Sequence, residues 1–116
     1  MLYRVYVSSD GGNTWVPFTG GQAAAGTATS SNVAGSASSV TLLAANPMRV
    51  GFTMFNESTS IVYVKLGATA SNASYTKQLL PNDFWSSAML GFNYTGRIDA
   101  IWASGVGNMR VTEMSA

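Results

Sequence analysis

Side chains that most often carry out acid–base and nucleophilic chemistry are scarce in this sequence. The chain of 116 residues contains no histidine and no cysteine. This excludes a Ser-His-Asp triad, a Cys-His dyad and a zinc site built from those ligands. Five carboxylates remain, and nothing in their spacing indicates a glycosidase pair or a calcium loop. We therefore expect no catalytic residue, no cofactor and no metal site, and predict that the protein is not an enzyme. The carboxylates are Asp10, Glu57, Asp83, Asp99 and Glu113.

Charged side chains are few and mixed in sign. They make up 9% of the residues, where about 25% is usual, and six basic against five acidic groups give a net charge of +1. The basic residues are scattered singly, whereas nucleic-acid binding needs a clustered cationic face. No apolar run approaches the roughly 18 to 20 residues that cross a bilayer, and no signal peptide is visible. We expect no nucleic-acid or membrane partner, and a surface of hydroxyl and amide groups that other proteins cover.

One short motif near the N-terminus is well defined. Ser8, Asp10, Gly12, Thr14 and Trp15 fit the pattern S-x-D-x-G-x-T-W. The side chains of Ser8 and Asp10 can bond turn amides, Gly12 permits a positive φ, and Trp15 can pack on the strands. The motif resembles the Asp box of sialidases and other β-propeller proteins, where it occupies turns away from the catalytic residues. A propeller needs at least four blades, and this chain has one copy of the box, so we interpret it as a structural turn.

The first 39 residues are predicted to form two segments. The apolar runs on either side of the box predict a β-hairpin over residues 1–18. An isolated hairpin is marginal in water, which makes Tyr3 and Phe18 candidate interface residues. Residues 19–39 are rich in Gly, Ala, Ser and Thr, and Val33 is their only large apolar residue. They are predicted to be either a flexible linker or an arm that becomes ordered on a neighbouring subunit.

Residues 40–116 are predicted to form one all-β domain. Short runs with apolar alternation are separated by turn signals, which is typical of an antiparallel β-sandwich or barrel of jelly-roll or Greek-key type. With the hairpin, we expect about seven to nine strands and less than about a tenth helix. Phe84 and the adjacent Trp85 are further candidate interface residues. The predicted strands are 40–43, 49–56, 61–66, 75–80, 84–89, 97–103 and 109–114, and the predicted core is Phe52, Met54, Val62, Val64, Leu66, Ile98, Ala100 and Trp102.

Polar residues in this domain are interpreted mainly as structural. Asn56 with Ser58 and Thr59 can close a turn through side-chain bonds to the backbone. Tyr94, Thr95 and Gly96 can form a corner before a buried strand. Pairing across strands is expected within the set Arg49, Arg97, Arg110 and Glu113, at a few tenths to about 1 kcal/mol each where exposed.

Four segments of this domain resemble a module that recurs in small structural proteins of tailed bacteriophages. They are residues 46–59, 63–67, 94–104 and 110–113. The resemblance implies a virion location and a capsid decoration (cement) protein that stabilises the head. It implies the major capsid protein or other virion proteins as partners, and a homo-oligomer, with a trimer favoured.

Two other functions remain open from the sequence. A tail, fibre or connector component of the virion could carry the same module. A carbohydrate-binding module could use Trp15, Trp85, Trp102 or surface tyrosines as stacking platforms, in which case coplanar exposed aromatic rings are expected.

Overall fold

The computed structural model describes residues 6–7, 16–17 and 24–116. Strand β1 (Tyr6–Val7) pairs antiparallel with β2 (Val16–Pro17), with Tyr6 opposite Pro17. This pairing lies within the predicted N-terminal hairpin. The turn of the Asp box, formed by Ser8, Asp10, Gly12, Thr14 and Trp15, lies outside the described residues, as do Tyr3 and Phe18.

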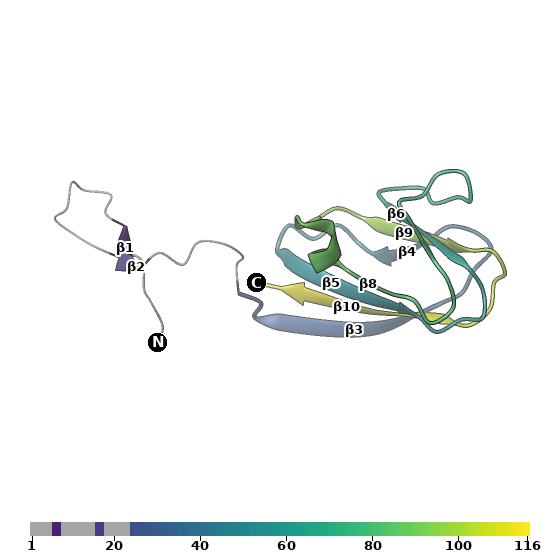
Figure 1. Ribbon diagram of the computed structural model, residues 1–116, viewed down its shortest axis with the longest axis horizontal. Coiled ribbons are helices and arrows are strands. Elements are labelled where there is room, and N and C mark those ends of the chain that lie inside the picture. Colours follow the sequence, from purple (N-terminus) through teal and green to yellow (C-terminus); the bar gives the residue numbers. More distant parts are fainter. Residues whose placement is uncertain (1–5, 8–15, 18–23) are drawn as a thin grey trace.

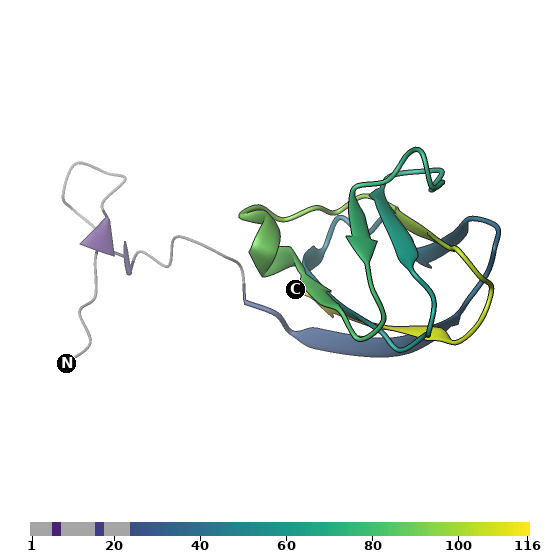
Figure 2. The same ribbon diagram turned by 45° about the vertical axis from the view of Figure 1, so that its right-hand side comes forward.

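The rest of the described chain forms two four-stranded antiparallel sheets packed face to face (Figures 1 and 2). One short 3₁₀ helix, η1 (Ser87–Leu90), follows β8 and lies at the end of the sandwich where the chain terminates. In order across the first sheet, the strands are β3 (Thr27–Ala34), β10 (Asn108–Ser115), β5 (Arg49–Asn56) and β8 (Phe84–Ser86). In order across the second, they are β4 (Val40–Leu43), β9 (Ile98–Trp102), β6 (Val62–Leu66) and β7 (Lys77–Leu79).

The strand pairs are nested along the chain. β3 pairs with β10, β4 with β9, β5 with β8 and β6 with β7. A long hairpin that folds over on itself produces this nesting and places alternate pairs in opposite sheets, which is the jelly-roll arrangement. The prediction of an all-β antiparallel sandwich is therefore confirmed. The two sheets remain separate, so the fold is not the closed barrel that the sequence also allowed.

The core lies between the two sheets and follows the predicted alternation. Phe52 and Met54 of β5 face Val62 and Val64 of β6, and all are buried. Leu66, predicted to belong to the core, is only partly buried at the end of β6. The ring of Phe52 packs edge-on against Trp85, with centroids 5.8 Å apart. The remaining buried hydrophobic residues are Leu42, Ala70, Leu79, Ile98, Ala100, Trp102, Met109 and Val111.

The interpretation of residues 19–39 as a linker or an arm on a neighbour is wrong for residues 27–34. These residues form β3, which pairs with β10 of the same chain along its whole length, from Thr27 opposite Ser115 to Ala34 opposite Asn108. The strand needs few apolar side chains because backbone hydrogen bonds hold it at the edge of the sheet, and only Val33 packs on the core. The sandwich therefore begins at Thr27 and not at residue 40.

Candidate binding surface

The outer face of the first sheet presents side chains in two rows that run across the strands. We call it the outer sheet face. Cross-strand partners in one row are Asn32, Arg110, Phe55 and Phe84. In the other row they are Ser30, Thr112, Thr53 and Ser86, of which Ser86 is buried. The face is therefore rich in hydroxyl groups, with an aromatic patch on the β5–β8 side.

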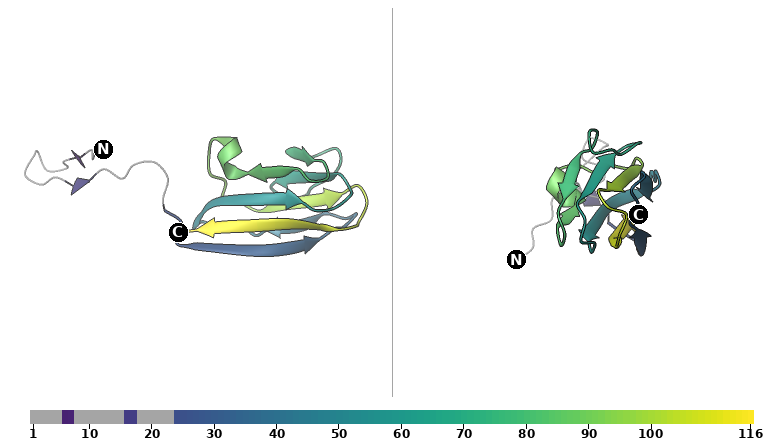
Figure 3. Two further views of the ribbon diagram at one scale, coloured as in Figure 1. Left: turned by 60° about the horizontal axis from the view of Figure 1, so that its bottom comes forward. Right: turned by 90° about the vertical axis from the view of Figure 1, so that its right-hand side faces the viewer.

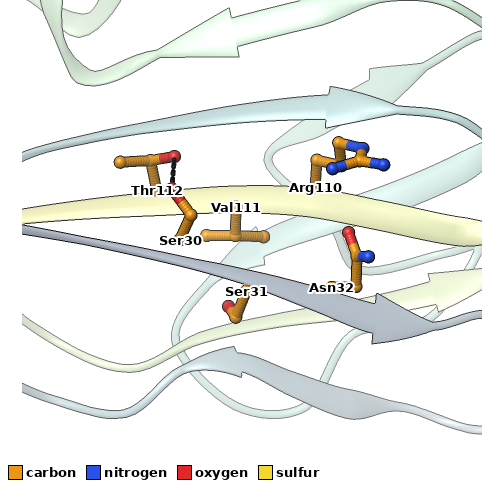
Figure 4. A pocket seen from close by; sticks show the side chains of 6 residues that line it. All are labelled: Ser30, Ser31, Asn32, Arg110, Val111 and Thr112. Atoms are coloured by element: carbon orange, nitrogen blue, oxygen red, sulfur yellow. Dashed lines mark hydrogen bonds between the residues drawn. The ribbon is translucent and has the colours of Figure 1, made fainter.

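The β3–β10 side of this face is polar and hollowed. A shallow, open hollow of about 200 Å³ lies at Ser30, Asn32, Arg110 and Thr112 (Figure 4). The hydroxyl oxygens of Ser30 and Thr112 are 2.9 Å apart and share a hydrogen bond. Arg110 forms an ion pair with Glu57, so its charge has a partner within the chain. The hollow can accept hydrogen bonds from, or donate them to, an uncharged polar surface.

The aromatic side of the face gives different results for the two candidate interface residues on β8. Phe84 is 51% exposed beside Phe55 and is accessible to a partner. Trp85 is only 4% exposed and belongs to the core, so its prediction as an interface residue is wrong. The reason is the pleat of β8, which points adjacent side chains to opposite faces of the sheet. Further exposed hydrophobic residues follow or precede β8, namely Leu80, Met89 and Phe92.

Arg49 is fully buried and joins three parts of the sandwich. Its Nε donates to Glu113 Oε2 at 2.8 Å, which confirms the predicted pairing across strands. Its terminal nitrogens donate to the carbonyl oxygens of Tyr94, Gly96 and Ala44, at 3.1, 2.8 and 2.6 Å. These bonds fix the loop before β9 and the segment after β4, so Arg49 is a structural residue.

The predicted turn at Asn56 is confirmed. Its side-chain nitrogen donates to the carbonyl oxygens of Ser60 and Leu79, at 2.9 and 3.1 Å. Its side-chain oxygen accepts from the amide and the hydroxyl of Ser58, at 2.9 and 2.6 Å. Thr59, which was also expected to take part, makes no side-chain hydrogen bond among the described residues.

The predicted corner at Tyr94 is also present. The Tyr94 hydroxyl donates to the carbonyl oxygen of Arg97 at 3.1 Å, so the ring folds back over Gly96. A Cβ atom at Gly96 would lie 2.5 Å from the tyrosine hydroxyl oxygen. Only glycine fits there without displacing the ring.

The carboxylates of the described residues interact within their own chain. Asp83 accepts from the amide of Leu80 at 2.8 Å and closes the turn before β8. Buried Asp99 accepts from Arg97 at 2.7 Å, and this hydrogen bond raises the pKa of Arg97 above its ordinary value. The second oxygen of Asp99 has no partner in the part of the chain that the structure describes. No three acidic groups lie together among those residues to form a metal site.

The aromatic platforms expected for sugar binding are not formed by the described tryptophans. Trp85 and Trp102 are both buried, and Trp15 lies outside the described residues. Tyr63 and Tyr75 lie together outside the second sheet, but their rings are inclined at 54° and do not form a coplanar platform. A hollow of about 280 Å³ adjoins Tyr63 and is also lined by Ser71 and Asn72.

The polar residues of the outer sheet face were missed in the sequence because β3 was not recognised as a strand. A signal was present. Residues 27–34 contain neither glycine nor proline, they are bounded by Gly26 and Gly35, and they include two threonines and a valine. That pattern is typical of a short polar strand between two breaks.

Comparisons with known proteins leave the family resemblance as a prediction. The chain matches no family model, and it has no significant match among curated proteins or solved structures. No helix in the described residues has the length and apolar character needed to span a membrane.

Proposed function

We propose that the protein is a non-enzymatic structural component of a tailed-bacteriophage virion, acting as a decoration protein that stabilises the capsid head. The observation that carries the proposal is the outer sheet face, which is broad, rich in hydroxyl groups and bordered by exposed Phe84. Its basic residue Arg110 is neutralised by Glu57. A face of this kind suits docking on another protein, since its burial leaves no unpaired charge.

The internal contacts give several residues of the segments that resemble the phage module a structural role. Arg49, Tyr94, Gly96 and Glu113 belong to the segments that resemble the phage module, and they form one bonded network. Asn56, from the same segments, closes the turn between β5 and β6. The shared residues therefore specify a scaffold, and differences in function between such proteins are expected to lie on the exposed faces.

Cementing a capsid requires binding and no chemistry. Apolar area buried against the major capsid protein contributes about 25 cal/mol per Å² before the costs of association are subtracted. Many copies bound over one shell make weak single contacts effective. The partners are the major capsid protein or other virion proteins, and the protein is expected to act as a homo-oligomer in the virion.

Co-sedimentation with capsids of the same phage that lack the protein tests the proposed face. The wild-type chain should bind and raise the temperature at which the heads rupture. Phe84→Asp should reduce occupancy at least about tenfold, because a charge would be buried at the contact. Val106→Asp is the matched control, since Val106 is 45% exposed but lies in the β9–β10 loop. Equal occupancy for wild type and both variants would contradict docking through the outer sheet face.

A further inference from the structure

Strand β3 presents a long, open edge. It is the outermost strand of its sheet, with β10 on one side and no described strand on the other (Figure 3, left). It runs for eight residues without proline, charge or bulge. Natural sheets usually protect such edges with a lysine, a proline or a bulge, because an open edge pairs readily with another strand.

The other sheet edges are short or interrupted. β8 and β7 have three residues each, and β7 carries Lys77. β4 has four residues and a register shift in its pairing with β9. Among the described strands, β3 is therefore the edge that can pair over a long distance.

The backbone groups that point out from this edge can be identified from the hydrogen bonds next to it. The amide of Gly35 donates to the carbonyl of Gly107 at 2.8 Å, so Gly35 faces β10. The backbone amide and carbonyl groups of successive residues point alternately to the two sides of an antiparallel strand. Those of residues 27, 29, 31 and 33 therefore also point towards β10. The amides and carbonyls that point away from the sheet are those of Ala28, Ser30, Asn32 and Ala34.

We propose that β3 pairs antiparallel with β3 of a second copy of this chain, about a two-fold axis that passes beside Ser31. In this register Ala28 lies opposite Ala34 of the second copy, and Ser30 lies opposite its Asn32. Each of these is a hydrogen-bonded pair, so every outward amide and carbonyl of the strand finds a partner. The first sheet of one copy and the first sheet of the other then form one continuous sheet. Their outer sheet faces become one surface.

A second copy fits this edge because the strand is complementary to itself. The opposed side chains are small and uncharged, so no like charges meet across the axis. Ser30 and Asn32 lie on the outer sheet face, and Ser31 points to the opposite side of β3 (Figure 4). Among the described strands each molecule has one such edge, and two-fold pairing uses the edges of both copies, so the assembly closes at two copies. The contact makes a dimer and not the trimer that the phage resemblance favours, and it does not depend on the virion role.

A cysteine at the axis tests the register directly. Paired residues that do not exchange hydrogen bonds have Cα atoms about 4.5 Å apart, a separation that a disulfide can span. Ser31→Cys should therefore give a covalent dimer under mild oxidation with oxidised glutathione in the folded protein. The chain has no other cysteine, so any disulfide dimer joins the two introduced residues. Thr29→Cys is the control, since the two residues 29 would be roughly 13 Å apart along the strands. Equal cross-linking of both variants, or none of Ser31→Cys, would overturn the proposal.

Sedimentation equilibrium of the full chain tests the assembly without any cross-link. The wild type should sediment as a dimer. Ser30→Pro removes an outward amide and keeps the backbone hydrogen bonds to β10, and it should weaken the dimer at least about tenfold. Like Ser30→Ala, it also loses the side-chain hydrogen bond to Thr112. Ser30→Ala keeps that amide and should stay dimeric. A monomeric or trimeric wild type, or an unchanged dimer in folded Ser30→Pro, would overturn the proposal.

Discussion

The guanidinium group of Arg49 lies inside the sandwich, with its Nε 2.8 Å from Glu113 Oε2. The arginine side chain is fully buried, whereas that of Glu113 keeps 21% of its surface exposed. The pair joins the start of β5 to β10, and the remaining nitrogens of Arg49 satisfy three backbone carbonyls. It therefore differs from the exposed ion pair of Arg110 and Glu57 in burial and in the number of groups it holds.

Replacing this arginine should be costly. Arg49→Met should lower the free energy of unfolding by about 3–5 kcal/mol, because it leaves the Glu113 carboxylate and three partly buried backbone carbonyl groups without their partner. Arg110→Met is the matched control, since that side chain is 62% exposed, and it should cost less than about 1 kcal/mol. Urea denaturation followed by circular dichroism measures both values. Similar losses in the two variants would show that the Arg49 network does not hold the sheets together.

The turn at Asn56 should depend on its amide. Asn56→Ala removes the side-chain bonds to Ser58, Ser60 and Leu79, and it should destabilise the protein by about 3 kcal/mol. Asn72→Ala, at an exposed position in the β6–β7 loop, should change stability by less than about 0.5 kcal/mol. Thermal unfolding of the two variants gives the comparison. A loss below about 1 kcal/mol for Asn56→Ala would contradict a structural role for this turn.

Substitutions at two glycines allow the stability cost of backbone strain to be measured apart from the cost of steric overlap. Gly91 and Gly107 have φ values of 75° and 72°. A Cβ atom at Gly91 meets nothing within 4 Å, whereas at Gly107 it would lie 2.5 Å from the Cβ of Ser58. Gly91→Ala should cost about 1–2 kcal/mol, the usual penalty for a left-handed residue. Gly107→Ala should cost at least about 2 kcal/mol more because of the added steric overlap, measured as the difference in unfolding free energy. Equal costs would contradict the close packing of the β9–β10 loop on Ser58.

Much of the sandwich could be predicted because its strands alternate between buried and exposed side chains. The alternation in β5, β6 and β9 gave both the strand positions and the core, including Phe52, Val64 and Trp102. The nesting of the strand pairs could not be predicted, since it depends on contacts between residues far apart in the sequence. Contacts of this long-range kind also set the register of β8 against β5. That register points Trp85, and not Phe84, into the core.

The candidate surface was harder to predict than the core. β3 is stabilised by backbone pairing with β10, which lies about 80 residues later in the chain, and a hydropathy pattern carries no information on such pairing. The burial of Arg49 could not be predicted from the sequence, for a related reason. Three of its acceptors are backbone carbonyls, and the sequence cannot show where a carbonyl will lie.

Immunogold labelling of purified virions tests the proposed function most directly. If the proposal holds, antibodies raised against the chain should label the heads of intact phage particles at many sites on each shell. Labelling confined to the tail or to the head–tail junction would replace the decoration role with that of a tail or connector component. Absence of the protein from purified virions, measured by mass spectrometry of the same particles, would contradict a structural role in the virion.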